Sequence, residues 1–121
     1  MNKRDIGSWY ETLACIYLKE QNIKILKRNF RVRSGEIDIV AFDGKYYCFI
    51  EVKYRKNTKY GGPEAAVTLS KQKQICNVSR FYLAFNQISE SAPIRYDVIA
   101  ISGEEGASTI KWYKDAFQYM L

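Results

Sequence analysis

The sequence predicts a single α/β domain over residues 1–121, in which helices flank a mixed central β-sheet. Two observations predict this class. Two segments repeat apolar residues at helical spacing, and other segments alternate apolar and polar residues as strands do. The resulting order is helix, three strands, helix, two strands. Because a long helix separates the two groups of strands, the pairing cannot all be antiparallel.

Composition excludes several kinds of enzyme. The chain has no histidine, which rules out a Ser-His-Asp triad, a Cys-His pair and most catalytic zinc sites. Carboxylates, lysines and a hard cation with oxygen ligands remain for hydrolytic chemistry. The formal net charge of +6 fits a polyanionic partner such as nucleic acid, and it also fits a soluble protein with a solvated basic face.

Cysteine usage and apolar runs indicate the compartment. The odd number of widely spaced cysteines, Cys15, Cys48 and Cys76, predicts buried free thiols in a reducing cytosol. No apolar run approaches the length of a membrane span, and no signal-peptide pattern is present. We therefore expect a cytoplasmic protein without a membrane partner.

The first element is an amphipathic helix from Ile6 to Gln21, with Asp5 as the expected N-cap. Glu11 lies at the edge of its apolar face. A glutamate in such a position is usually solvated, and the alternative is that it faces a site on the sheet. Helical spacing alone does not decide between the two.

The second element is a basic strand from Ile23 to Val32, followed by Arg33 and a turn at Ser34-Gly35. Its interleaved charges include Arg31. They serve either to keep an edge strand from aggregating or to contact phosphates, whose oxygens match the arginine fork. The pattern favours neither role over the other.

The central feature is a hairpin in which Glu36–Phe42 and Tyr46–Tyr54 are joined by a turn at Asp43-Gly44. Strand side chains alternate, so Glu36, Asp38, Val40 and Phe42 share a face opposite Ile37, Ile39 and Ala41.

Turn length decides how the hairpin aligns Asp38 with Glu51. A two-residue loop sets them diagonally and a four-residue loop sets them directly opposite, with Lys53 on the same face in both cases. A three-residue loop separates them onto different faces unless a bulge intervenes. Two carboxylates on one face repel unless a positive charge lies between them, and a divalent cation supplies that charge.

The remaining elements are a loop, a helix and two strands. The loop after the hairpin interleaves cations with tyrosines, a mixture that suits a nucleic-acid backbone and an unstacked base, although an ordinary connection has the same composition. Its cations are Arg55, Lys56 and Lys59. A helix from Ser70, its expected N-cap, to Asn86 carries Lys71.

After that helix, Arg95–Ser102 alternates as a strand, and we expect Arg95 to pair with Asp97 in a structural role. Gly103–Gly106 predicts a turn, and Thr109–Tyr113 predicts a short last strand. Asp115 is expected to cap a terminal helical turn.

These motifs resemble a known group of proteins. Asp38 followed by Glu51-Val52-Lys53 after a hairpin turn is similar to the core of the PD-(D/E)XK nuclease superfamily. The chain as a whole resembles the YraN-like family of small bacterial proteins in that superfamily. Four stretches carry this closer match: Gly7–Glu11 with Ala14, Asn29–Arg31 leading into Gly35–Asp38, Phe49–Arg55, and Arg95–Val98. Ile37 stands where the superfamily name has proline, a position that often varies.

The resemblance implies a restriction-endonuclease-like core and a metal-dependent phosphodiesterase. Asp38, Glu51 and the backbone carbonyl of Val52 would hold Mg²⁺ or Mn²⁺, and Lys53 would orient the attacking water and stabilise charge on the phosphate. Related nucleases, including archaeal Holliday-junction resolvases, have a glutamate on the first helix, which implies that Glu11 is a further catalytic or metal-binding residue.

Nucleic acid is the implied partner, with DNA favoured and branched or repair intermediates as attractive substrates. The implied phosphate contacts are Arg31, Arg33, Arg55, Lys56, Lys59 and Lys71. Two other functions remain open at this point: a nucleic-acid-binding module with a silent nuclease site, and a scaffold whose acidic residues are surface decoration. The sequence fits a monomer or a homodimer, and it does not separate DNA from RNA or endonuclease from exonuclease.

Overall fold

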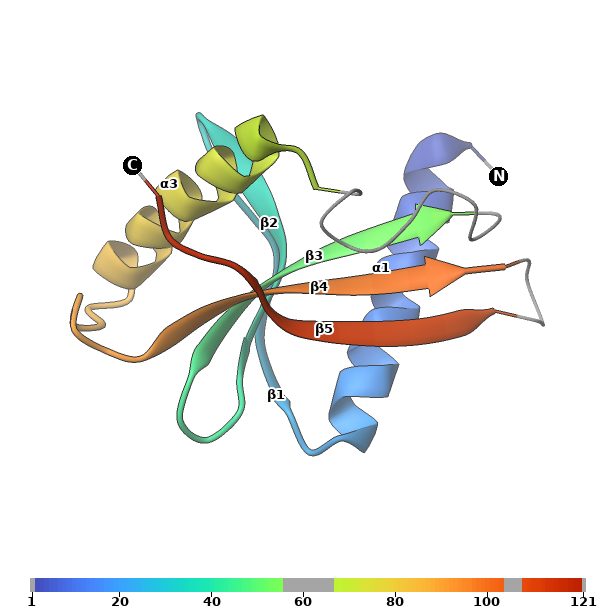
Figure 1. Cartoon of the computed structure of the whole chain (residues 1–121), viewed down its shortest axis with the longest axis horizontal. Coiled ribbons are helices and arrows are strands. Elements are labelled where there is room, and N and C mark those ends of the chain that lie inside the picture. Colours follow the sequence, from blue (N-terminus) through green and yellow to red (C-terminus); the bar gives the residue numbers. More distant parts are fainter. Residues whose placement is uncertain (1, 56–66, 104–107, 121) are drawn as a thin grey trace.

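The protein is a five-stranded sheet with one helix on each face, and Figure 1 shows α3 and α1 on its two sides. The computed structural model describes residues 2–55, 67–103 and 108–120. This architecture confirms the predicted α/β class. In chain order the elements are α1 (Lys3–Glu20), β1 (Lys24–Val32), β2 (Gly35–Phe42), β3 (Tyr47–Arg55), α3 (Leu69–Phe85), β4 (Ile94–Ser102) and β5 (Thr109–Phe117).

The sheet is mixed, as predicted. Its strands follow one another in the order β1-β2-β3-β4-β5, with β3 and β4 parallel and every other pair antiparallel. The parallel pair forms because α3 carries the chain back across the sheet between β3 and β4. Each half of the sheet is therefore an antiparallel unit, and the two units join along the β3–β4 seam.

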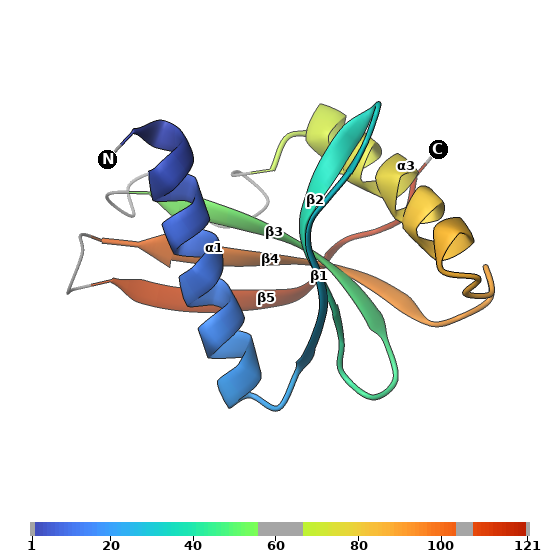
Figure 2. The same ribbon diagram turned by 180° about the vertical axis from the view of Figure 1, so that it is seen from behind.

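Two apolar cores hold the layers together. Figure 2 shows α1 crossing one face of the sheet, where Ala14 and Leu18 pack with Ile50. On the other face α3 packs Ile75 against Phe49. The three cysteines are buried free thiols, which confirms that prediction.

The β2–β3 hairpin has a four-residue connection, one of the lengths that the sequence allowed. Phe42 pairs with Tyr47, and the Asp43 carboxylate accepts hydrogen bonds from the backbone N–H groups of Lys45 and Tyr46 at 2.9 and 2.7 Å. Gly44 adopts φ 101°, which favours glycine. This connection sets the register that aligns Asp38 with Glu51.

β2 bends away from β3 at Asp38, which the sequence did not predict. The last pair of the β2–β3 ladder is Ile39 with Ile50. Ile39 packs in the core under α1, but Ile37 packs in the core under α3, so the expected alternation of these two side chains was wrong. The part of β2 that precedes Asp38 pairs with β1, and together they form a twisted ribbon beside α3 (Figure 1). We call the place where β2 leaves β3 the fork.

The predicted helix starts were displaced by two or three residues. α1 has Asn2 as its N-cap, and the Asn2 side chain accepts from the Asp5 backbone N–H at 2.9 Å. Asp5 lies instead in the first turn, where its charge complements the helix dipole. α3 has Thr68 rather than Ser70 as its N-cap, with a hydrogen bond of 3.1 Å from the Lys71 backbone N–H.

The predicted helical turn at Asp115 was also wrong. β5 continues through Phe117, with Asp115 at φ 55° in a bulge opposite Asp97. The Asp97 carboxylate accepts from the Asp115 backbone N–H at 2.9 Å, which fixes this bulge. The extended chain also places Phe117 over Tyr96, with ring centroids 5.2 Å apart, so burial of an aromatic pair outweighs a local capping preference.

Two further points concern the predictions on membrane contact and on loop residues. Within residues 2–55, 67–103 and 108–120, neither helix has the length and apolar character to cross a bilayer. The cations Lys56 and Lys59 and most of the turn predicted at Gly103–Gly106 lie outside the described residues.

Candidate metal centre

Two carboxylates meet at the fork. Continuing the hairpin register past Ile39 and Ile50 places Asp38 directly opposite Glu51, as expected for a four-residue loop. Both side chains are buried, with 9% and 7% exposure. Asp38 Oδ2 accepts a hydrogen bond of 2.8 Å from the Val52 backbone N–H. This side-chain hydrogen bond takes the place of a backbone hydrogen bond at the point where the two strands separate.

The environment of Glu51 disfavours its charged form. Burial raises the pKa of Glu51 far above its ordinary value, and hydrogen bonding to Asp38 and the Asp38 charge raise it further. Lys71 and Lys53 oppose this rise. Two adjacent carboxylates repel unless a positive charge lies between them, and a divalent cation would supply that charge.

Glu11 reaches the same place from α1. Burial and the charge of Asp38 raise the pKa of Glu11 to about 7, while Arg28 and Asn29 lower it. Glu11 Oε1 is buried, so this part of the carboxyl does not face bulk solvent. Burial of this oxygen and the influence of the Asp38 charge are consistent with the alternative in which Glu11 faces a site on the sheet.

Two oxygens of this cluster have no hydrogen-bond partner among the described residues. Glu11 Oε1 and Glu51 Oε2 are both buried and unpartnered within the described residues. Unpartnered buried oxygens are costly, and a cation is the partner that acidic oxygens accept most readily. They fit Mg²⁺ or Mn²⁺, which bind oxygen ligands.

The cluster is not a complete metal cage. Across the described ranges, no group of three or more acidic, histidine or cysteine side chains is arranged to hold a metal ion. Magnesium is commonly held by one or two carboxylates, with water and substrate phosphate supplying the other oxygens. The Asp38–Glu51 pair meets that smaller requirement.

The strand geometry of β3 adds two groups. In a strand, the N–H and C=O of one residue point to the same side, so the Val52 carbonyl points toward Asp38 along with the Val52 N–H. Lys53 follows two residues after Glu51 on the same face, and its charge lowers the Glu51 pKa. Both placements agree with the roles that the resemblance implies.

Lys71 completes the charge balance from α3. Its Nζ lies 3.7 Å from Glu51 Oε2 and donates to Gln74 Oε1 at 3.0 Å. A Cβ on Gly35 would meet the Gln74 side chain at 2.5 Å, so a larger residue there would displace Gln74. Gln74 accepts the hydrogen bond from Lys71, so the two side chains are held together beside the carboxylates.

Two residues beside Glu11 were not predicted as site residues from the sequence. Arg28 donates through Nη2 to Thr12 Oγ1 at 3.0 Å, which ties β1 to α1 beside Glu11. Asn29 has φ 53°, and its side chain hydrogen-bonds Glu11. An asparagine inside a predicted strand is an available signal, because asparagine is depleted in strands and enriched at positive φ.

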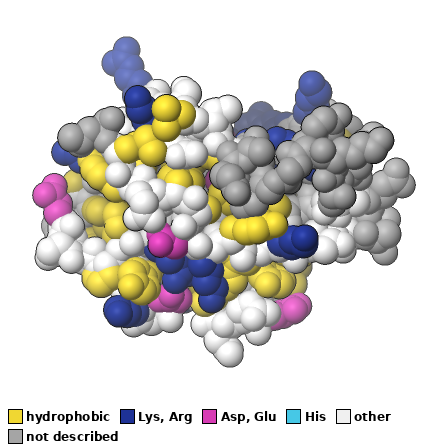
Figure 3. Space-filling view, in the orientation of Figure 1, with side chains coloured by type: hydrophobic (Ala, Val, Ile, Leu, Met, Phe, Trp, Pro, Cys, Tyr) yellow, Lys and Arg dark blue, Asp and Glu magenta, His cyan; other side chains and the backbone are white. Residues whose placement is uncertain are grey.

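The predicted phosphate contacts fall into separate groups. Lys71 lies at the fork, and Arg55 lies at the end of β3. Arg31 and Arg33 lie at the far end of the ribbon, where Arg31 pairs with Glu36 at 2.7 Å. Figure 3 shows basic side chains scattered over one face among hydrophobic ones, so the net charge does not form a single patch there.

A second acidic group lies at the other half of the sheet. Asp97 is fully buried and accepts from Arg95 Nε at 3.0 Å and from Trp112 Nε1 at 2.9 Å, in addition to the Asp115 backbone N–H. Arg95 also donates to Asp43 at 2.9 Å. This confirms the predicted structural pairing of Arg95 with Asp97.

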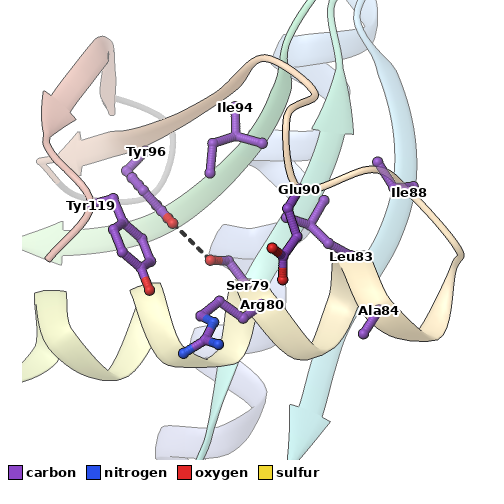
Figure 4. A pocket seen from close by; sticks show the side chains of 9 residues that line it. All are labelled: Ser79, Arg80, Leu83, Ala84, Ile88, Glu90, Ile94, Tyr96 and Tyr119. Carbon is purple, nitrogen blue, oxygen red and sulfur yellow. Dashed lines mark hydrogen bonds between the residues drawn. The ribbon is translucent and has the colours of Figure 1, made fainter. Parts of the chain in front are cut away.

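A cavity of about 370 Å³ beneath the C-terminal half of α3 is separate from these groups. Figure 4 shows its lining, in which Ser79 and Tyr96 hydrogen-bond each other at 2.7 Å and Arg80 and Glu90 add opposite charges. None of the carboxylates at the fork lines this cavity.

Comparison with known proteins gives a consistent result. A family model described as "Uncharacterised protein family UPF0102" matches residues 10–101, a range that contains the carboxylates of the fork. A "UPF0102 protein" of Lachnoclostridium phytofermentans is 48% identical over 97% of this chain and 96% of the relative. Relatives with the same description from Geobacter metallireducens and Colwellia psychrerythraea are 44% and 41% identical, over 98% and 93% of this chain and 96% and 88% of their own lengths.

Proposed function

The chain belongs to the UPF0102 (YraN-like) family, and we propose that it is a metal-dependent nuclease with a restriction-endonuclease-like core of the PD-(D/E)XK type. One observation carries this proposal: the buried carboxylates of Asp38 and Glu51 lie opposite each other at a fork in the sheet, and Lys53 follows Glu51 by two residues. The resemblance of Asp38 and Glu51-Val52-Lys53 to the nuclease motif adds to that observation.

The residues divide the work as follows. Asp38, Glu51 and the Val52 carbonyl would hold Mg²⁺ or Mn²⁺, with Glu11 as a further oxygen ligand. Such a cation would supply charge neutralisation at the scissile phosphate and a water molecule of lowered pKa. Lys53 would orient the attacking water and stabilise the charge that develops on the phosphate. Lys71 balances the Glu51 charge and contacts the substrate phosphate.

A second function has one observation in its favour. Lys71 already lies 3.7 Å from Glu51, so the protein carries its own counter-charge for the carboxylate pair. A nucleic-acid-binding module with a silent nuclease site would keep such a lysine in place of a cation. Binding without cleavage is its prediction, with affinity that falls steeply as salt rises.

A cleavage assay tests the nuclease. Single-stranded, duplex, flapped and four-way-junction DNA and RNA are incubated with Mg²⁺, Mn²⁺ or EDTA. We expect metal-dependent cleavage by the wild type and by Glu20→Gln, an exposed change on α1, but not by Glu51→Gln. Equal cleavage by Glu51→Gln would contradict the assigned role. Binding of every substrate without cleavage would favour the silent module.

A further inference from the structure

A groove of about 520 Å³ lies between the turn of the β1–β2 ribbon and the outer side of α3. It is distinct from the carboxylate cluster, and no residue at the fork lines it. Of the described residues that line it, two are arginines and none is acidic. The residues that matter for its chemistry are Arg31, Arg33, Ser34, Asn77, Phe81 and Phe85.

Two exposed phenylalanines form one wall. Phe81 is 42% exposed and Phe85 is 64% exposed, with ring centroids 6.0 Å apart. Phe85 is held from behind by the buried Phe30, at 6.0 Å between centroids. A pair of large exposed aromatic rings that is anchored in this way indicates a binding surface rather than incidental exposure.

The opposite wall is basic. Arg33 is exposed at the turn, and the Arg31 side chain is 62% exposed. The ion pair of Arg31 with Glu36 uses only Nε, and a guanidinium has five N–H donors, so donors remain for a phosphate. Aromatic faces beside arginine forks match the bases and the backbone of an unpaired strand.

Contacts connect this groove to the fork. Asn77 donates to Ser34 at 3.0 Å, Gln74 lies against Gly35, and Gln74 accepts from Lys71, which faces Glu51. Ten helical residues from Lys71 to Phe81 span about 15 Å. At about 3.4 Å per stacked nucleotide, that distance is about four nucleotides of one strand.

We propose that this groove binds a single-stranded segment of the substrate that continues from the cleavage site along α3. The position of the scissile bond in this inference rests on the proposed nuclease function. The binding of a single strand rests on the groove alone. A duplex keeps its bases stacked inside the helix and cannot present their faces to Phe81. The substrate is therefore a nucleic acid with an unpaired flank, such as a flap, an overhang or a splayed branch.

Binding without metal tests the groove separately from cleavage. A fluorescent 12-nucleotide single strand, as DNA or RNA, and a 12-base-pair duplex are titrated with the full chain in EDTA. Phe81→Ala should weaken single-strand binding about 5- to 100-fold, the range for loss of one stacked base, and leave duplex binding within about twofold. Phe81→Tyr keeps a stacking face and should bind within about twofold of the wild type.

Controls separate stacking from general apolar contact. Ile16→Ala removes a comparably exposed apolar side chain from α1 and should change nothing. Phe81→Leu keeps apolar area but has no aromatic face, so it should resemble Phe81→Ala. Full single-strand affinity in Phe81→Leu, or an equal loss on both probes, would overturn the proposal and indicate an apolar protein partner or unspecific charge.

The basic wall has its own readout. Arg33→Gln should reduce the slope of log affinity against log salt for the single strand by about 0.7, the value for one phosphate contact. An unchanged slope would remove Arg33 from the groove. Because these measurements contain no metal, a protein that fails to cleave any substrate still answers them.

Discussion

In the described part of the chain, two buried acidic groups are partnered in opposite ways. Asp97, at the β4–β5 end of the sheet, accepts from Arg95, from Trp112 and from the Asp115 backbone. At the fork, by contrast, Glu51 Oε2 is buried, accepts no hydrogen bond from the described residues and lies 3.7 Å from the Lys71 ammonium. Both groups lie in the same sheet, and only the first has its full set of donors.

The difference indicates which group serves the fold. A buried carboxylate with matched donors is satisfied by its own chain and fixes local geometry, as the Asp97 group fixes the bulge of β5. A buried carboxylate pair with incomplete partners costs stability, so it is expected where an external ligand completes it. The fork therefore has the character of a site, and the Asp97 group that of a structural brace.

Loss of catalysis is the largest expected effect. Asp38→Asn removes a proposed metal ligand without changing side-chain size, and we expect cleavage to fall at least about 1,000-fold while the protein stays folded. Rates are measured at saturating Mg²⁺ on whichever substrate the wild type cleaves, with circular dichroism as the check on folding. A folded Asp38→Asn variant with wild-type cleavage rates would contradict the functional role proposed for the fork.

The next largest effect is a loss of folding stability, which we expect for substitutions in the Asp97 group. Asp97→Asn removes the charged acceptor of Arg95, which keeps its ion pair with Asp43, so the free energy of unfolding should fall by about 1.5–3 kcal/mol. Urea unfolding monitored by tryptophan fluorescence measures this change. A cost below about 1 kcal/mol would mean that Asp97 is not the structural counterpart proposed for it.

Glu11 should have an intermediate effect. Its pKa of about 7 means that it loses its proton near neutral pH, so its contribution to cation binding should increase between about pH 6 and 8. Glu11→Gln should lower Mg²⁺ affinity about 10- to 100-fold at pH 8 and flatten its dependence on pH. Titrations at several pH values measure this, with Glu20→Gln as the control on the same helix. A pH dependence unchanged by Glu11→Gln would place Glu11 outside the site.

The smallest effect is on stability without metal. A carboxyl whose pKa rises on folding stabilises the protein fully below its ordinary value, 4.5 for Glu51, and loses that contribution as pH rises. Glu51→Gln does not ionise. In EDTA at pH 8 its melting temperature should exceed that of the wild type by about 3–6 °C, or about 1 kcal/mol, with the difference vanishing near pH 4.5. A variant less stable than the wild type at pH 8 would show that Glu51 is well partnered.

Local patterns explain why much of this could be predicted. Alternation along β2 and β3 and the Asp43-Gly44 turn depend on neighbouring residues, and they were sufficient to bring Asp38, Glu51 and Lys53 to one place. The mixed sheet followed from the position of the second helix. The resemblance supplied Glu11 and Lys71, which periodicity alone could not place.

Long-range packing explains what could not be predicted. The bend at Asp38 arises where β2 leaves β3 and joins the ribbon over α3, and a regular strand pattern contains no sign of it. The close approach of Gly35 to Gln74 depends on elements almost forty residues apart. The helical turn predicted at Asp115 was wrong because a capping preference is a local property of the sequence. The Asp115 backbone N–H instead donates to Asp97, which lies on another strand.

The carboxylate pair itself can be tested most directly by counting protons. Mn²⁺ is titrated calorimetrically into the protein at pH 7 in two buffers of different ionisation enthalpy. If the cation displaces the proton that the raised pKa of Glu51 retains at pH 7, binding should be one-to-one and release at least about one proton, and Glu51→Gln should abolish both. Tight binding without proton release, or binding unaffected by Glu51→Gln, would contradict a cation site at the fork.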